Sequence, residues 1–464
     1  MVEMKAVVRD VSKHFEGHNV RDLFEKISSR PYSILLESGA GPKKISRYSI
    51  MSCNPGVIVR SLGEKIEVVQ DGSVKKFNGD PLEFLDEKLG ETKTNYTGDI
   101  PFIGGAVGYF SYDLCWLTEG VKTTGKDEFG MWDMEFGFYD KALVFDHHED
   151  KKYIVSTSGE KEEKEFLTLF DKEPASSDES DDVRAEDLNS NFSKDEYFKA
   201  VEKVRNCIRE GDIYQANLSQ QFTAKTNADS WTIYKKLYQA SPAPFSAYLN
   251  FGGVKIISSS PERFLKIRGG IVETRPIKGT RPRGKTRLED EKLKKQLAES
   301  GKDRAEHLMI VDLERNDLGK VCEYGSVKVA ELEAIESYAD VHHMVSTIRG
   351  KIRRDKSIVD CIRACFPGGS ITGAPKHRSM EVIDEIEPAK RGVYTGALGY
   401  IGFNETCDLN IVIRTMILKD GKIRFNVGGG VVYDSTPAGE YEETFDKARG
   451  ILKSIGLEGR WRRK

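Results

Sequence analysis

The sequence lacks any apolar run long enough to cross a bilayer, and its first ten residues lack the apolar core of a secretory signal. It also lacks a charge imbalance, because 71 Lys and Arg residues face 74 Asp and Glu residues. The resulting formal charge of -3 gives no electrostatic reason to expect nucleic acid or an anionic membrane as a partner.

Cysteine is scarce as well, with seven residues scattered over 464 positions. An odd number without regular spacing predicts reduced thiols and a cytoplasmic protein rather than a disulfide-linked scaffold. Cys361 and Cys365 lie one helical turn apart, but no second pair and no nearby histidines accompany them. A zinc site is therefore not expected there.

The first part of the chain, residues 1–170, is predicted to form a β-rich N-terminal domain. The alternating patterns predict strands at Ser33–Glu37, Val57–Ser61, Lys65–Gln70, Phe102–Phe110, Phe136–Phe145 and Lys152–Ser156. Short helices are expected at Asn19–Ser28 and Pro81–Leu89. Gly104, Gly105 and Gly108 indicate that something packs closely on the backbone of one strand. This region has no catalytic set of residue types, so we expect it to serve as scaffold, in regulation or in partner binding.

An acidic segment, residues 171–192, has few apolar side chains to bury and is predicted to be a linker. The next domain, residues 193–456, starts at Ser193, which with Glu196 matches a helical capping box. Residues 457–464 form a basic tail.

The stretch Thr274–Gly284 contains two prolines and two glycines, which exclude a helix and restrict the backbone. Lys278 lies in the middle of it. An amine that must reach one carbon of a substrate needs such a rigid position. A basic surface loop explains the same residues, because Arg275, Arg281 and Arg283 surround the lysine.

Other polar residues are open to two interpretations. Glu262 lies at a strand end, where site residues are common, but alone it is more typical of an ordinary surface carboxylate. His343, in a predicted strand, is more often an ordinary hydrogen-bonded histidine. Glu440 and Glu443 share a face at a helix start, where they can complement the helix dipole or, with Glu306, hold Mg²⁺.

A glycine-rich turn, Phe366–Lys376, is predicted to open a helix at Lys376–Glu387. Free amides at a helix start favour an anion, here a carboxylate rather than a nucleotide, since the spacing does not match a Walker loop. One helix is expected over Glu289–Asp312, and a strand over Lys422–Gly428 before three consecutive glycines.

Taken together, the motifs of residues 193–456 resemble those of the chorismate-utilising enzymes. The matching segments are Pro276–Thr280, Glu306–His307, Arg315–Asp317, Phe366–Lys376, Arg414–Thr415 and Glu440–Glu443. The resemblance implies an α+β fold, with two large antiparallel β-sheets in a sandwich, helices on the outside and the site in a cleft. The N-terminal domain also resembles that of the amino-transferring branch, through Leu35–Ser38 and Arg47–Ser49.

Within that branch, lysine at position 278, together with Asn217 and Pro242–Ala247, resembles aminodeoxychorismate synthase component I. Anthranilate synthase component I usually carries alanine at the position of Lys278, and it is the alternative in the same class. A non-catalytic protein that binds tryptophan or chorismate is the alternative from a different class.

The resemblance also implies roles for individual residues. The implied catalytic residues are Lys278, Glu262 and His343, the substrate-binding residues are Ser370, Tyr394, Arg414, Gly428, Gly430 and Lys447, and the Mg²⁺ ligands are Glu306, Glu440 and Glu443. Ser38 matches a position that contacts tryptophan in the anthranilate branch. The substrates implied are chorismate and ammonia. Since the chain has no room for a Cys-His-Glu glutaminase domain, we expect a separate glutamine amidotransferase subunit to supply the ammonia.

Overall fold

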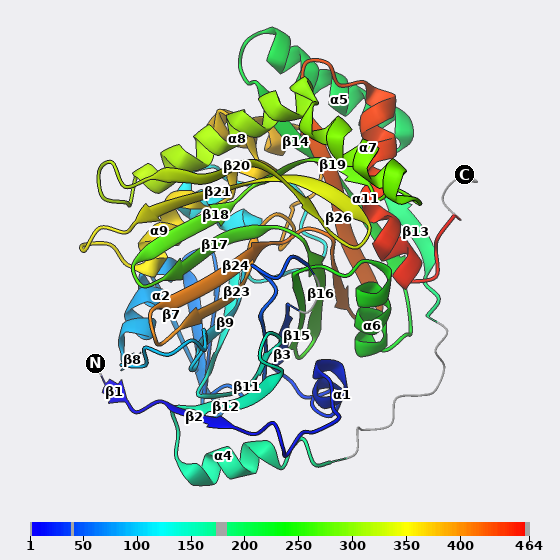
Figure 1. Ribbon diagram of the computed structural model, residues 1–464. Helices are drawn as coiled ribbons and strands as arrows, with labels where there is room; N and C mark the ends of the chain where they lie inside the picture. Colours follow the sequence, from blue (N-terminus) through cyan, green and yellow to red (C-terminus); the bar gives the residue numbers. More distant parts are fainter. Residues whose placement is uncertain (1, 39–40, 173–182, 460–464) are drawn as a thin grey trace.

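The computed structural model describes residues 2–38, 41–172 and 183–459. Two twelve-stranded antiparallel sheets dominate it (Figure 1). The first sheet contains, in spatial order, β19 (Ile277–Pro282), β21 (Val341–Lys351), β18 (Ile271–Arg275), β17 (Arg263–Arg268), β24 (Thr406–Ile411), β23 (Ala397–Gly402), β9 (Gly105–Phe110), β10 (Met134–Tyr139), β5 (Val57–Leu62), β6 (Lys65–Gln70) and β7 (Ser73–Asn78). β20 (Lys328–Ser337) pairs with β21.

The second sheet packs against the first. It contains, in order, β13 (Glu186–Ser190), β14 (Gln215–Lys225), β26 (Lys422–Val431), β25 (Thr415–Lys419), β16 (Val254–Ser260), β15 (Phe245–Phe251), β3 (Ser33–Glu37), β4 (Tyr48–Ser52), β11 (Lys141–Asp146), β12 (Lys151–Ser156) and β2 (Val7–Asp10). β22 (Gly373–Ala374) pairs with β14, and β1 (Val2–Met4) pairs in parallel with β8 (Thr92–Thr94).

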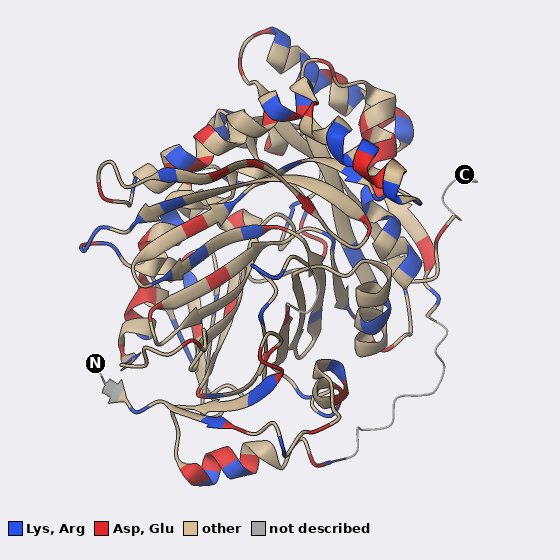
Figure 2. Cartoon of the chain, in the orientation of Figure 1, with Lys and Arg blue, Asp and Glu red and all other residues tan. Residues whose placement is uncertain are grey.

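Helices lie outside the two sheets (Figures 1 and 2). They are α1 (Val20–Glu25), α2 (Pro81–Gly90), α3 (Cys115–Thr118), α4 (Glu160–Leu167), α5 (Lys194–Arg209), α6 (Ser230–Ala240), α7 (Arg287–Ala298), α8 (Gly301–Gly319), α9 (Ile358–Cys365), α10 (Lys376–Ile386) and α11 (Pro437–Ser454), with short 3₁₀ turns η1 (Tyr112–Leu114) and η2 (Gly369–Ile371). Among the described residues, no helix combines the length and apolarity needed to span a membrane.

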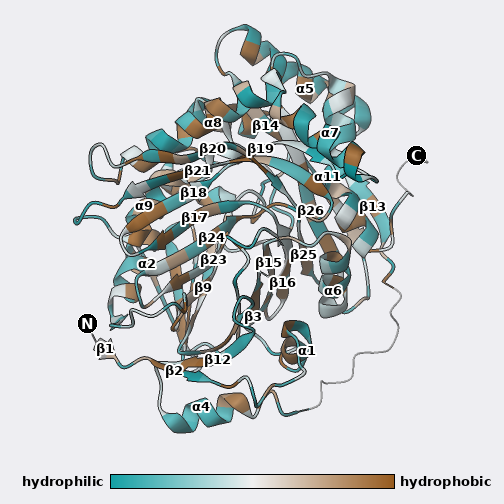
Figure 3. Cartoon of the chain, in the orientation of Figure 1, coloured by the Kyte–Doolittle hydropathy of each residue, from teal (hydrophilic) through white to brown (hydrophobic). Residues whose placement is uncertain are grey.

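A buried apolar layer lies between the sheets. It contains Ile34 and Leu249 from the second sheet and Val107 and Leu398 from the first. Two further apolar clusters cover the outer faces, one under α6 and α11 and the other under α2, α8 and α9. Figure 3 shows the corresponding apolar residues on the strands, with polar residues on the outer helices. The predicted α+β sandwich with helices outside is therefore confirmed.

Most predicted elements form where the sequence placed them. The capping box of Ser193 and Glu196 starts α5, as expected. The prediction of close backbone packing is also confirmed, because a Cβ on Gly108 would lie 2.0 Å from the carbonyl oxygen of Glu135 in the next strand.

Three boundaries were predicted wrongly. The single strand expected over Phe136–Phe145 is broken at Asp140 into β10 and β11, which belong to different sheets. The helix expected over Glu289–Asp312 is two helices, because the Ser300 side chain accepts the Asp303 amide and starts α8 anew. The three glycines expected after a strand are part of β26 itself.

The regions assigned to two domains share both sheets. β9, from the N-terminal region, lies between β23 and β10, and β3 lies between β15 and β4. The predicted linker, residues 171–192, lies partly outside the described residues, and its described part includes β13, which pairs with β14. A strand forms there because its backbone completes the edge of the second sheet, a long-range pairing that composition does not reveal.

Candidate active site

Lys278 lies on β19, at the edge of the first sheet, rather than on a surface loop. Its register against β21 shifts between Lys278 and Thr280, which is a β-bulge at Gly279. Gly279 has φ +75°, and a Cβ there would lie 2.8 Å from Leu297. Both the backbone angle and the close approach therefore require glycine, so the segment that carries Lys278 is tightly fixed.

The Lys278 amine is half-buried and donates to the carbonyl oxygen of Ser370 at 3.4 Å. Burial, and next the nearby Lys447 ammonium, lower the pKa of Lys278, whereas the carboxylates of Glu306 and Glu262 oppose that shift. Loss of the proton is what a lysine needs in order to act as a nucleophile.

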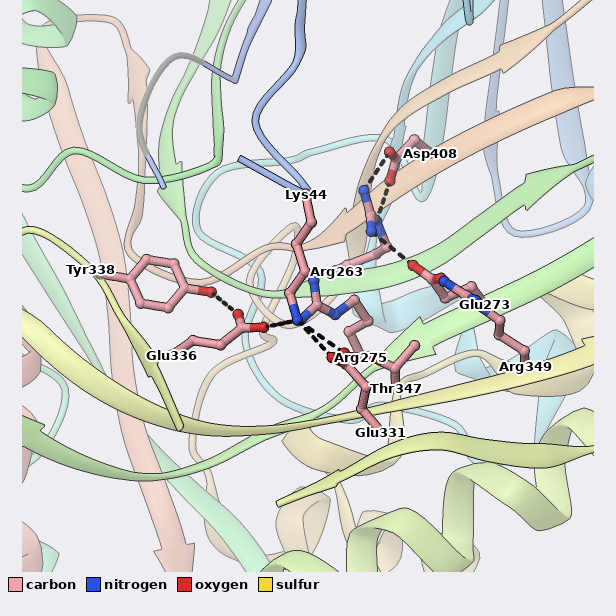
Figure 4. Close-up of polar contacts among 10 residues, drawn as sticks. All are labelled: Lys44, Arg263, Glu273, Arg275, Glu331, Glu336, Tyr338, Thr347, Arg349 and Asp408. Atoms are coloured by element: carbon pink, nitrogen blue, oxygen red, sulfur yellow. Dashed lines mark hydrogen bonds and ion pairs between the residues drawn. The ribbon is translucent and has the colours of Figure 1, made fainter. Parts of the chain in front are cut away.

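Arg275, one of the cations that surround Lys278 in the sequence, forms its contacts away from the Lys278 amine. Neighbouring residues on a strand point to opposite faces, so Thr274 reaches Glu314 while Arg275 forms a buried ion pair with Glu336. Figure 4 shows Glu336 also bound by Lys44 and Tyr338.

Glu262 lies between β16 and β17 with 5% of its surface exposed. Its Oε1 accepts the backbone amide of Ile277 at 3.3 Å, which ties it to the segment that carries Lys278. Burial raises the pKa of Glu262, against the influence of the nearby Ser370 hydroxyl, of that amide and of the Lys278 ammonium. A carboxyl with a raised pKa retains a proton that it can donate.

His343 lies on β21, opposite Thr280. Its Nδ1 is 2.9 Å from the Thr280 hydroxyl, and its buried Nε2 has no hydrogen-bond partner in the described part of the chain. Burial, and then the charge of Arg414, lower the pKa of His343 to about 3, so the imidazole is neutral at ordinary pH. Burial lowers the pKa of Arg414, and the charges of Asp340 and Glu262 oppose that shift, which places Arg414 near the same site.

The three predicted metal ligands approach the site from two helices. Glu306 lies on α8, and Glu440 and Glu443 lie on α11. A Cβ on Gly429 would be 3.1 Å from both Glu440 Oε2 and Glu443 Oε1, so the two carboxylates meet over this glycine. Within the described ranges, no three ligand side chains are preassembled around a metal position.

The protonation of these carboxylates differs. Glu440 is buried and accepts the Ser435 hydroxyl through Oε1 at 2.6 Å, while its Oε2 has no partner among the described residues. Burial raises the pKa of Glu440, whereas Lys447, 2.8 Å from Glu443, lowers the pKa of Glu443. An unpartnered buried carboxylate oxygen beside a second carboxylate fits a hard cation that binds oxygen.

The predicted substrate-binding residues fall into two groups. The Lys447 ammonium donates to the carbonyl oxygen of Gly428 at 2.8 Å. The Ser370 hydroxyl is buried beside Lys278 and has no hydrogen-bond partner among the described residues. Tyr394 packs instead near the buried guanidinium of Arg391, whose central carbon lies 5.7 Å from the centre of the Tyr394 ring. Gly430 lies against the Gln215 side chain, which would be 2.7 Å from an added Cβ.

Ser38 lies apart from these residues. It lines a cavity of about 340 Å³ whose other walls include Arg47, Arg263 and Asp408 and, among the described residues, none of the predicted catalytic or metal residues. The Ser38 hydroxyl donates to the carbonyl oxygen of Pro244 at 2.8 Å. The tryptophan contact at Ser38 stays a prediction.

Comparison with known proteins agrees with this geometry. Residues 35–453 match the family described as chorismate binding enzyme. The chain belongs to this family. It is a chorismate-utilising enzyme of the aminodeoxychorismate and anthranilate synthase type.

Relatives of both types are similarly close. The chain is 40% identical to anthranilate synthase component 1 of Acetivibrio thermocellus, over 94% of this chain and 92% of that protein. It is also 40% identical to aminodeoxychorismate synthase component 1 of Bacillus subtilis (strain 168), over 96% of each. The crystal structure of anthranilate synthase component I from Streptococcus pneumoniae TIGR4 matches with a TM-score of 0.79 and 33% identity, covering 87% of this chain and 91% of that one.

Some residues of this chorismate-binding chain escaped the sequence-based assignment. The Thr280 hydroxyl is hydrogen-bonded to His343, and Glu314 of α8 is buried and accepts the hydroxyl of Thr274 on β18. Lys376 forms a buried ion pair with Asp317 at 2.5 Å. Arg315–Asp317 and Lys376 belong to motifs that the sequence does display, but their pairing across 59 residues has no local signal.

Proposed function

We propose that this chain is aminodeoxychorismate synthase component I. It would convert chorismate and ammonia to 4-amino-4-deoxychorismate, a precursor for p-aminobenzoate and folate-type biosynthesis. The observation that carries this proposal is Lys278 itself, an amine with a lowered pKa on a bulged strand beside the buried acid Glu262.

The proposed chemistry consists of two successive allylic displacements. The neutral Lys278 amine adds at C2 of chorismate, both conjugated ring double bonds shift, and the C4 hydroxyl leaves as water after taking a proton from Glu262. Ammonia then adds at C4, both double bonds shift back, and the C2–N bond breaks, which releases Lys278 as the neutral amine. A proton from the new C4 ammonium returns to Glu262. Two displacements retain the configuration at C4, which one direct displacement would invert.

The remaining residues would hold the substrate. The carboxylates of chorismate would bind two cations, Arg414 and Lys447. The ring would meet the free hydroxyl of Ser370. The neutral His343 offers its unpartnered Nε2. We further propose that Glu306, Glu440 and Glu443 hold Mg²⁺, which when bound supplies positive charge for a substrate carboxylate.

The nitrogen source is part of the proposal. A separate glutamine amidotransferase subunit would release ammonia for this chain, and a separate lyase would remove the enolpyruvyl group that the product retains. The isolated chain should therefore use ammonium and leave glutamine unchanged. Hydrolysis of glutamine to glutamate by the pure chain would contradict the assignment of a separate subunit.

A second candidate function is anthranilate synthase component I. The 40% identity to the Acetivibrio thermocellus protein favours it. It would use the same cleft without a lysine nucleophile and would release pyruvate.

One experiment separates the two candidates. The pure chain is incubated with chorismate, Mg²⁺ and ammonium, and the products are identified by mass spectrometry. We expect 4-amino-4-deoxychorismate and, when ammonia is withheld, a mass increase on the peptide that contains Lys278. Release of anthranilate and pyruvate by the wild type would show that the second candidate is correct.

A further inference from the structure

Lys376 is the first residue of α10 and is 6% exposed. A cation at a helix N-terminus opposes the helix dipole, so the helix itself does not favour this side chain. Its Nζ is instead bound by Asp317 Oδ2 at 2.5 Å and by the carbonyl oxygen of Cys365 at 3.1 Å. Among the described residues, no side chain caps the backbone amides at this helix start, so the anion expected at those amides stays a prediction.

These two bonds close a loop. Cys365 ends α9 and Lys376 begins α10, so one ammonium ties together both ends of the glycine-rich turn, residues 366–375. The same ammonium attaches the turn to Asp317 on α8, the helix that carries Glu306.

Asp317 is 3% exposed and has a second lysine partner. Lys320, one turn further along α8, reaches Oδ1 at 2.8 Å with a side chain that is 48% exposed. Glu119, from the N-terminal region, lies 3.8 Å from Lys376 Nζ. The buried pair is therefore surrounded by further charges. Lys320 also donates to the carbonyl oxygen of Ala364 in α9 at 3.4 Å, but of the two lysines only Lys376 joins α9 to the start of α10.

The turn lies directly against the reacting amine. Its η2 segment carries Ser370, whose carbonyl oxygen accepts Lys278 Nζ at 3.4 Å and whose hydroxyl is buried without a partner in the described chain. Gly369 packs against Leu313 of α8, where an added Cβ would come within 2.8 Å. Movement of the turn relative to α8 would thus displace Ser370 from Lys278.

We propose that Asp317 and Lys376 are positioning residues, whose ion pair fixes the turn so that Ser370 holds the Lys278 amine in its reactive place. Neither residue touches the reacting atoms. Their loss should lower kcat more than it changes KM, because a small displacement of a reacting group is costly in rate. The proposal rests on the proposed function, in which Lys278 is the nucleophile.

The chain offers a matched control, since two lysines bind the same carboxylate. Lys376→Met should lower kcat about 10- to 100-fold. Lys320→Met removes the other ion pair of Asp317, outside the turn, and should leave kcat within about twofold of the wild type. Total consumption of chorismate is measured in each case. The mass increase on the Lys278 peptide of the wild type is measured alongside, so that failure of the proposed function is distinguished from failure of the positioning role.

A double variant separates positioning from stability. Replacing a buried ion pair with apolar residues commonly restores stability, so Asp317→Leu with Lys376→Met should recover the melting temperature. Its kcat should remain at least ~10-fold low, with KM for chorismate within about threefold, because an apolar pair lacks the directional bond to Cys365.

Four results would overturn the proposal. The first is a double variant with wild-type kcat. The second is an equal loss of kcat in Lys320→Met and Lys376→Met. The third is a raised KM with unchanged kcat, which would indicate a role in substrate binding only. The fourth is failure of every Lys376 variant to fold, which would make the ion pair a folding element.

Discussion

The surroundings of Lys278 and the cavity beside Ser38 differ in how their charged side chains are paired, although the cavity also contains two unpartnered neutral atoms, the Tyr48 hydroxyl and Asn410 Oδ1. In the cavity, Arg263 binds Asp408 at 2.8 and 2.9 Å and Glu273 at 3.0 Å, and Arg47 binds Asp146. Around Lys278, the Ser370 hydroxyl, His343 Nε2 and Glu440 Oε2 are buried without partners among the described residues.

This difference indicates which region performs chemistry. A buried charged or ionisable group without a partner costs folding free energy, and a ligand that completes it is one reason for a protein to retain it. The two regions are nevertheless adjacent, because Glu262 and Arg263 are consecutive residues, one facing each region. Each prediction below tests whether unpartnered groups mark the reaction and paired ones mark structure.

The largest effect should come from removing Mg²⁺. Glu440 keeps a free oxygen beside Glu443, and without a cation these carboxylates repel the substrate's own carboxylates. We expect excess EDTA to abolish chorismate turnover and added Mg²⁺ to restore it, as measured by substrate consumption. Full turnover in EDTA would refute the ligand assignment.

Lys278→Ala should lower formation of 4-amino-4-deoxychorismate at least ~10³-fold, because it removes the nucleophile. The space left beside C2 should admit ammonia and allow some C2-aminated product. Lys278→Arg should fail equally, since a guanidinium stays protonated. Chromatography with mass detection measures both products. A wild-type rate for Lys278→Ala would show that the lysine serves only as a local cation.

Glu262→Gln should lower kcat by about 10²- to 10³-fold, because the amide cannot protonate the departing hydroxyl. The Gln side chain can still accept the Ile277 amide, so the backbone beside Lys278 should be undisturbed. Circular dichroism recorded over one thermal unfolding scan checks that the variant is folded. Retention of full kcat would transfer the role of the acid to another group.

Glu314→Gln should change stability more than rate. Burial raises the pKa of Glu314 to about 8, so the folded state keeps a proton that the unfolded chain releases near pH 4.5. Stability is therefore lost as pH rises between these values. The variant should be more stable than the wild type at pH 8, by on the order of 1–3 kcal/mol, with no such difference below pH 4.5. Urea unfolding at both pH values measures this.

Lys44→Met, on the side of the cavity, should have the smallest effect. Glu336 keeps Arg275 and Tyr338 as partners and Glu331 keeps Thr347, so no carboxylate is left alone (Figure 4). We expect a loss below about 1 kcal/mol in unfolding free energy and chorismate turnover within twofold. A tenfold loss of turnover would contradict the contrast between the two regions.

The sequence predicted what local pattern determines. The strands at Ser33–Glu37 and Lys65–Gln70 agree with the structure residue by residue, and the restricted backbone expected around Lys278 is present as the bulge at Gly279. The sequence did not predict to which face of the sheet the Arg275 side chain points, because that depends on the register of β18 against its neighbours. The division at Asp140 between two sheets, and the pairing of Lys376 with Asp317, likewise depend on contacts between distant segments.

The position of β9 and β3 inside the sheets has a consequence for how the chain can be made and divided. Both strands are flanked on one side by strands that are synthesised more than 130 residues later. Until those later strands leave the ribosome, the nascent N-terminal region presents open strand edges of the kind that recruit chaperones or aggregate. A gene split at residues 171–192 would therefore yield two fragments that need each other to complete either sheet, rather than two independent modules.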